Sequence, residues 1–305
     1  MEAAATRCYR HPSYETYVRC TRCDRYICPD CMREAPVGHH CVECVKEGQR
    51  SVRRARSIFG GAVPTAAAPY VTYTLMALNI IAYVVEVVRP LTVDRFGTLG
   101  ALLLDSDGGR YYYRGGTAYG YDLVGVAGGE WYRLVTGAFL HLAPDNSFGV
   151  MHLVFNMFAL WSLGRVVEGQ LGRARYLALY LLSAVGGSVL VYVLASPNDT
   201  TVGASGAIFG LAASFYVINR RLGRDMRAVN QFMAGFLLWM VISAALTSWQ
   251  GHLGGLLTGG LVTYVLAYAP AKLRTSAVQI AAGAVLLGLL AAVVVARTAA
   301  LTAAV

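Results

Sequence analysis

The sequence predicts an all-α polytopic membrane protein, a seven-helix bundle, with a small cysteine-rich module at its N-terminus. The chain of 305 residues is 56% hydrophobic and 14% charged, whereas an average soluble domain has about 25% charged residues. Seven apolar stretches follow residue 69, and each approaches or exceeds the ~17 residues that a helix needs to cross a bilayer. All seven cysteines lie between Cys8 and Cys44.

The apolar stretches define the membrane part of the chain. They run over residues 70–88, 149–167, 175–195, 202–219, 229–247, 250–269 and 276–296. The second and sixth contain polar residues, and the last is the most uniformly apolar. We therefore divide the chain into a module at 1–46, a linker at 47–69 and a membrane part from residue 70 onward.

The basic residues between these stretches predict the orientation. Lys and Arg precede the first stretch and occupy the connections after the second, fourth and sixth, whereas 196–201 and 247–249 contain none. Because cytoplasmic connections collect Lys and Arg, we expect a cytoplasmic N-terminus. The long loop at 89–130 then lies at the outer interface. The net charge of +9 follows this alternation and forms no single patch for nucleic acid.

The N-terminal cysteines form pairs with two intervening residues. These are Cys8/His11, Cys20/Cys23, Cys28/Cys31 and Cys41/Cys44. Eight such ligands satisfy two closed tetrahedral zinc sites, which leave no open position for a catalytic water, so we expect two structural Zn²⁺ ions. The start of the chain has no apolar signal-peptide core, so we expect thiols and not disulfides. His39 and His40 are alternative ligands.

The module resembles B-box-type zinc fingers. In that family the pairs interleave, which would place Cys8, His11, Cys28 and Cys31 on one ion and Cys20, Cys23, Cys41 and Cys44 on the other. The spacing by itself also allows consecutive pairing. B-box-like modules usually bind other proteins, so the resemblance implies a cytoplasmic protein partner.

Four polar residues stand out within the apolar stretches: His152, Asn156, Ser205 and His252. Polar residues inside a membrane are costly and are candidates for function. With the N-terminus inside, the stretches that carry them all begin at the outer face. At a rise of about 1.5 Å per residue, Ser205 and His252 lie roughly 4–8 Å below that face. His152 and Asn156 are i and i+4, so they share a helix face.

Two G-x3-G motifs, at 206–210 and 255–259, accompany these residues. Small residues at this spacing let two helix backbones approach closely. Close packing of the fourth and sixth stretches would bring Ser205 within hydrogen-bond reach of His252, as a nucleophile and its base require.

Together these residues resemble the motifs of rhomboid intramembrane serine proteases over about residues 70–270. The matching segments are Trp131–Tyr132–Arg133, H-x3-N at His152 and Asn156, G-A-S-G around Ser205 and GHLGGLLTG around His252. The resemblance implies a dyad without an acidic third member, in which Ser205 attacks the scissile carbonyl and His252 transfers its proton. His152, Asn156 and the Ser205 backbone N–H would stabilise the oxyanion. The last stretch resembles the seventh helix that some rhomboids add. The resemblance therefore implies a 6+1 bundle, with a six-helix core at 70–270 and an additional C-terminal helix at 271–305.

The resemblance also implies transmembrane segments of other proteins as substrates, cut within the lipid bilayer near the outer face of the cell membrane, without a catalytic cofactor. His141 matches a further family histidine. The segment between His141 and His152 is longer than in familiar relatives. Phe209 stands where many relatives have a Tyr that stacks on the catalytic His, and a phenyl ring can still stack.

Three other functions fit the sequence less well. A catalytically inactive rhomboid-like protein that binds and escorts membrane proteins would usually lack the Ser or the His. A transporter would have charged residues near the membrane midplane. A simple anchor for the zinc module would need neither seven spans nor four polar residues at one depth.

Overall fold

A computed structural model describes residues 6–51, 57–59, 68–116, 119–146, 148–245 and 247–303. The chain forms two compact units, Met1–Ala55 and Arg56–Val305. Most of the expected linker at 47–69 lies outside the described residues. Its first residues belong to helix α1 (Val42–Ser51), so the secondary structure of the first unit runs past the expected boundary at residue 46.

The N-terminal unit has very little hydrophobic core. It contains a short antiparallel pair of strands, β1 (Met32–Glu34) and β2 (His39–Cys41), followed by α1. In the described part of this unit, the buried cluster consists of the cysteines and Ile27. Burial of so few apolar side chains contributes little free energy, so cross-links or a metal must supply much of the stability.

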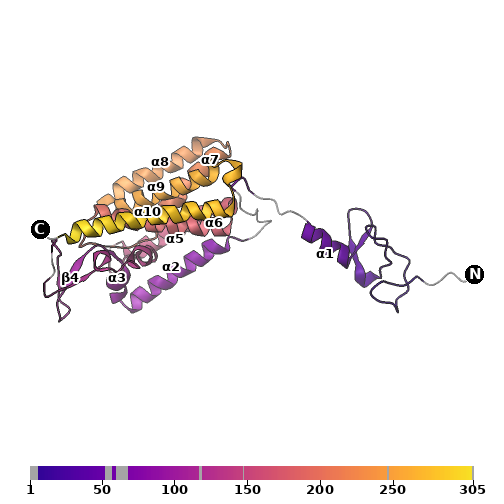
Figure 1. The fold of residues 1–305 in the computed structure, drawn as a ribbon, viewed down its shortest axis with the longest axis horizontal. Helices are drawn as coiled ribbons and strands as arrows, with labels where there is room; N and C mark the ends of the chain where they lie inside the picture. Colours follow the sequence, from indigo (N-terminus) through magenta and orange to yellow (C-terminus); the bar gives the residue numbers. More distant parts are fainter. Residues whose placement is uncertain are drawn as a thin grey trace, which may run out of the picture. The chain divides into compact units, whose positions relative to one another are not determined.

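Each of the seven apolar stretches forms a helix in the second unit (Figure 1). These helices are α2 (Tyr70–Val88), α5 (Gly149–Leu171), α6 (Arg173–Leu194), α7 (Ser205–Arg221), α8 (Met226–Ile242), α9 (Trp249–Tyr268) and α10 (Ser276–Thr302). Within the described residues, α2, α5, α6 and α10 are long and apolar enough to cross a membrane, and α8 is a shorter apolar helix. The chain is thus a multi-pass membrane protein, and its seven crossings stay a prediction.

The helices α6, α7 and α9 pack at the centre of this unit. Glycines make their close approach possible. A Cβ on Gly255 would collide with the carbonyl oxygen of Gly206, and a Cβ on Gly259 would collide with the backbone of Gly210. The two G-x3-G motifs therefore face each other, as expected from the sequence.

Gly255→Ala is expected to destabilise the membrane unit by about 1–3 kcal/mol, because the added methyl forces α7 and α9 apart. Thermal unfolding in detergent measures this effect. Gly288→Ala on α10 is the matched control, because a Cβ there meets no atom within 4 Å. Equal unfolding temperatures for the two variants would contradict the packing described here.

The connection between α2 and α5 is a folded cap. It contains α3 (Leu91–Phe96), β3 (Thr98–Leu99), β4 (Leu102–Leu104), β5 (Arg110–Tyr111), β6 (Asp122–Val124), α4 (Arg133–Thr136) and two short 3-10 helices, Val126–Gly128 and Gly137–Phe139. β4 is the central strand of a three-stranded sheet. β3 pairs with β7 (Thr200–Thr201), which lies just before α7. The cap therefore holds the segment that leads into Ser205.

Candidate active site

Ser205 and His252 meet where two helices begin. Ser205 is the first residue of α7, and His252 lies in the first turn of α9. The Oγ of Ser205 is 2.9 Å from the Nε2 of His252. Ser248 caps α9 by accepting a hydrogen bond from the Gly251 N–H at 3.2 Å, which fixes the helix start next to His252.

The His252 ring is oriented by stacking. It lies on Phe209 with ring centroids 4.3 Å apart and an interplanar angle of 12°, and Phe209 packs edge-on against Phe236. The Nδ1 of His252 is buried and has no hydrogen-bond partner among the described residues. An aromatic face, and not a carboxylate, thus fixes the ring. If Nε2 accepts the Ser205 hydroxyl hydrogen, the ring proton lies on Nδ1.

His152 on α5 borders the same space. Its Nδ1 accepts a hydrogen bond from the Leu142 N–H at 3.3 Å, which leaves the ring proton on Nε2. A Cβ placed on Gly203 would lie 3.1 Å from this Nε2 and 3.4 Å from the Ser205 Oγ. Gly203 has φ +139°, a conformation that glycine adopts without strain. An N–H donor therefore points to the space beside the serine oxygen.

Asn156 shares a face of α5 with His152, as their spacing predicts. It is buried one turn after His152, and its Nδ2 donates to the His152 carbonyl oxygen at 2.7 Å. The structure thus brings Ser205, His252 and His152 together, and the Asn156 amide is bonded to the backbone of its own helix. A role of Asn156 in oxyanion binding stays a prediction.

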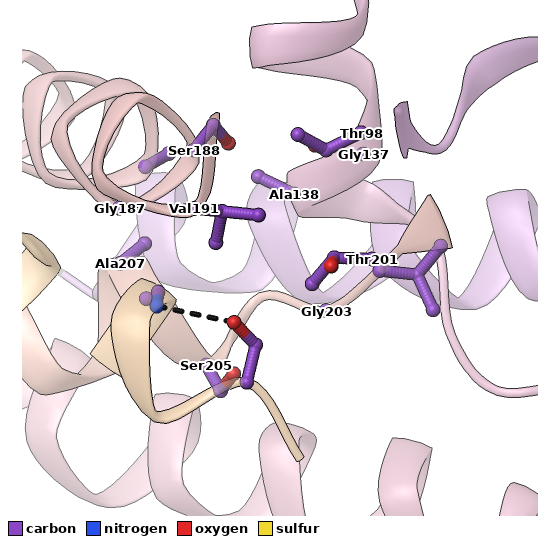
Figure 2. A pocket seen from close by; sticks show the side chains of 15 residues that line it. Thr98, Gly137, Ala138, Gly187, Ser188, Val191, Thr201, Gly203, Ser205 and Ala207 are labelled. Carbon is purple, nitrogen blue, oxygen red and sulfur yellow. Dashed lines mark hydrogen bonds between the residues drawn. The ribbon is translucent and has the colours of Figure 1, made fainter. Parts of the chain in front are cut away.

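Two cavities reach Ser205. An open cavity of about 420 Å³ is lined by Ser205, His152 and polar residues of the connections 195–202 and 247–250. A second cavity of about 30 Å³ lies beside Ser205 and Thr98 (Figure 2). This smaller volume exceeds the ~10–15 Å³ needed for one water molecule. Water can therefore approach the serine from the end of the bundle where α7 and α9 begin.

The W-Y-R motif ends in Arg133, which organises the cap. Its buried guanidinium donates to Glu130 at 2.7 Å and to the carbonyl oxygens of Asp94 and Gly97 at 2.8 and 3.0 Å. Burial alone would raise the pKa of Glu130, but hydrogen bonds from Arg133 and from the Gly125 N–H hold this pKa below its usual value. The motif is therefore a structural link between α3 and α4.

Sequence reasoning singled out no residue of the first stretch, yet α2 has a buried polar face. Asn79 Oδ1 lies 3.2 Å from His141 Nε2, and both carboxylate oxygens of Glu86 accept the His141 N–H at 3.1 Å. The two α2 residues are seven apart, so they share one side of the helix. Two polar residues at this spacing in an apolar stretch are a signal that the sequence does contain.

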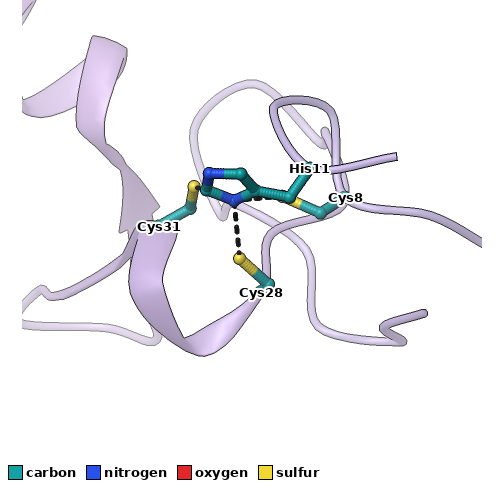
Figure 3. Close-up of side chains that lie close together, drawn as sticks. All are labelled: Cys8, His11, Cys28 and Cys31. Atoms are coloured by element: carbon teal, nitrogen blue, oxygen red, sulfur yellow. Dashed lines mark hydrogen bonds between the residues drawn. The ribbon is translucent and has the colours of Figure 1, made fainter. Parts of the chain in front are cut away.

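The candidate metal ligands form two groups. Cys8, His11, Cys28 and Cys31 form the first (Figure 3), and Cys20, Cys23, Cys41 and Cys44 form the second; in each, the ligand atoms lie within 4.8 Å of one another. This is the interleaved arrangement. His39 and His40, on β2, belong to neither group.

The spacing of these atoms fits a tetrahedral metal. The Sγ atoms of Cys23 and Cys41 are 3.7 Å apart, and His11 Nδ1 is 3.2 Å from Cys28 Sγ and 3.5 Å from Cys31 Sγ. Ligands at about 2.0–2.3 Å from a tetrahedral zinc are separated by roughly 3.5–3.8 Å. A disulfide would require about 2.05 Å, and all seven cysteines are free.

Comparison with known proteins identifies the class of the membrane unit. The Rhomboid domain family matches residues 128–269, a range that contains Ser205 and His252. YdcA of Bacillus subtilis (strain 168), assigned provisionally as a rhomboid protease, is 33% identical over 153 residues, which cover 49% of this chain and 73% of YdcA. The chain belongs to the rhomboid family.

Two further relatives are named as rhomboid proteases. AarA of Providencia stuartii is 29% identical over 232 residues, which cover 67% of this chain and 75% of AarA. GluP of Bacillus subtilis (strain 168) is 38% identical over 138 residues, or 44% of this chain, and the chain spans only 26% of GluP. At the level of the family, these names support intramembrane proteolysis.

Proposed function

We propose that this protein is an intramembrane serine endopeptidase that cleaves transmembrane segments of other membrane proteins. The observation that carries the proposal is the 2.9 Å contact between Ser205 Oγ and His252 Nε2 at the floor of a polar cavity. Membership of a family whose relatives are named as proteases supports the same reaction.

In the proposed reaction Ser205 is the nucleophile and His252 the general base. As the Oγ attacks the scissile carbonyl carbon, Nε2 of His252 takes the hydroxyl proton. The same nitrogen then protonates the leaving amine, and an ester remains on Ser205. His252 next takes a proton from water, whose oxygen attacks the ester carbonyl. The carboxylic acid product departs when the proton returns to Ser205. No cofactor takes part.

The oxyanion is proposed to bind between the His152 Nε2–H and the Ser205 backbone N–H. Ser205 begins α7, and the first N–H groups of a helix have no intrahelical acceptor and carry a partial positive charge. We assign Asn156 a share in this role through the amide hydrogen that the His152 carbonyl does not use. Each preorganised donor of this kind is worth about 2.7–4 kcal/mol.

The orientation is proposed from the loop charges. The connections that line the open cavity, 195–202 and 247–250, contain no Lys or Arg, so we place the cavity at the outer face and the N-terminus in the cytoplasm. A substrate helix hides its peptide bonds in backbone hydrogen bonds, so it must unwind locally to reach Ser205.

Cleavage in proteoliposomes tests this function. The substrate is a single transmembrane segment with Gly-Pro near its outer end, and mass spectrometry locates the cut. We expect cleavage in the outer third, and several-fold slower cleavage of a matched segment with Leu-Leu at that place. Tight binding of both segments without a cut would instead support the inactive escort protein.

We propose a second role for the N-terminal unit, as a B-box-like module that holds two structural Zn²⁺ ions and binds a cytoplasmic protein partner. The two interleaved groups, one of three cysteines with a histidine and one of four cysteines, support the metal assignment. Complete protein coordination leaves no open position, so the ions would supply folding energy and not catalysis. Pull-down of the same partner by the parent, but not by zinc-depleted protein, is the expected result.

A further inference from the structure

We propose that Glu86 is a positioning residue that orients His152 for oxyanion binding. This inference rests on the proposed protease function. Glu86 does not touch the serine or the catalytic histidine, and its effect passes through the backbone of His141 and Leu142. The structure therefore assigns a role in the reaction to a carboxyl group on the first membrane helix.

Glu86 is a buried carboxyl group on an apolar helix, an arrangement that indicates a function. It lies near the C-terminal end of α2 and is 3% exposed. Among the described residues it forms no ion pair, and the His141 N–H is the donor to both of its carboxylate oxygens, at 3.1 Å each. Burial of a carboxyl group in an apolar helix costs free energy, and a single hydrogen bond to the backbone offsets only a small part of it.

The anchored residue leads directly to His152. His141 is held by α2 at two points, since its N–H is bound to Glu86 and its Nε2–H to Asn79 Oδ1 at 3.2 Å. The next residue, Leu142, directs its N–H to Nδ1 of His152 at 3.3 Å. The His141 ring also packs edge-on against the His152 ring, with centroids 5.2 Å apart.

This chain of contacts selects one tautomer of His152. With the Leu142 N–H on Nδ1, the ring proton must lie on Nε2, which faces the space between Gly203 and Ser205. If the loop lost its anchor, the Leu142 N–H would leave Nδ1, and His152 could adopt the other tautomer or rotate. The oxyanion would then lose a donor for part of the time.

The expected effect follows from the size of one oxyanion donor. Complete loss of such a donor lowers kcat by about 10²–10³-fold, so partial loss of its alignment is expected to lower kcat by roughly tenfold. KM should change little, because the donor acts on the transition state. Glu86→Gln should keep most activity, because its amide oxygen still accepts the His141 N–H.

The test is a double-mutant cycle with His152, measured as kcat and KM for the transmembrane substrate in proteoliposomes. Glu86→Met, which has similar length but cannot accept the bond, should lower kcat roughly tenfold in the parent. It should have no further effect when His152 is already Ala, because both changes remove the same interaction. If Glu86→Met does not fold, Glu86→Asp takes its place, since the shorter carboxyl does not reach His141.

Glu168 provides a matched control. It is a buried carboxyl on α5 that accepts the Val71 and Thr72 N–H groups at 3.1 and 2.9 Å. Within the described part of the chain, its hydrogen bonds go to α2 and not to His141, Leu142 or His152. Glu168→Gln should shift thermal unfolding more than kcat. An additive loss for Glu86→Met with His152→Ala, or an unchanged kcat, would overturn the inference. Inactivity of the parent would instead overturn the proposed protease function, and full activity of Ser205→Ala would overturn its serine mechanism.

Discussion

Ser205→Ala is expected to lower cleavage of a transmembrane substrate by more than about 10³-fold, because the remaining site retains binding and oxyanion donors but has no nucleophile. His252→Ala should cause a similar loss, since the serine hydroxyl then has no base within reach. The double variant should be no slower than either single variant, because nucleophile and base act as one unit. Initial rates in proteoliposomes measure all three.

Ser214→Ala is the matched control for loss of a buried hydroxyl. Ser214 lies on α7, nine residues after Ser205. Its Oγ is 2.5 Å from the Oγ1 of Thr263, which lies on α9, eleven residues after His252. This variant should lose some thermal stability and keep its cleavage rate. If Ser205→Ala cleaved at the parental rate, the Ser205–His252 dyad would be wrong.

Removal of zinc is expected to unfold the N-terminal unit. Structural zinc contributes about 10–16 kcal/mol to the folding of small modules, and the described core of this unit is Ile27 and its cysteines. Chelation of the full-length protein should therefore release two ions per chain and make residues 6–51 sensitive to trypsin. Elemental analysis and peptide mapping measure the two effects.

Single substitutions separate the two zinc sites. Cys28→Ser and Cys20→Ser should each lower the zinc content from two ions to one, because they belong to different groups. His40→Ala should leave two ions, since His40 lies outside both groups. Two ions retained in both Cys variants, or one lost in His40→Ala, would contradict the interleaved sites.

Much of the membrane unit could be predicted, because short sequence patterns mark its helices and their close contacts. Runs of apolar residues mark the helices, and G-x3-G spacing predicts the close contact of α7 and α9. Ser205 and His252 each follow a short polar connection, so their common depth can be counted along the chain. The pairing of the zinc ligands could not be derived from spacing alone, because two arrangements give equally short turns.

The contacts of the loops could not be predicted, because they depend on distant residues. Asn79 and Glu86 bind a loop more than 50 positions away, and no local pattern names that partner. Asn156 shares a helix face with His152, yet its amide bonds the His152 carbonyl, an alternative that every helical Asn has available. The cap before α5 depends on Arg133 and on strand pairing with Thr200–Thr201.

The most direct test of the central claim, a serine nucleophile activated by His252, is covalent labelling with a fluorophosphonate. The full-length protein in liposomes is treated with the reagent, and the modified peptide is identified by mass spectrometry. We expect one adduct, on Ser205, and at least about a tenfold slower labelling in folded His252→Ala, because a serine hydroxyl is a weak nucleophile without its base. An adduct on another residue, or equal labelling of Ser205 without His252, would contradict the dyad.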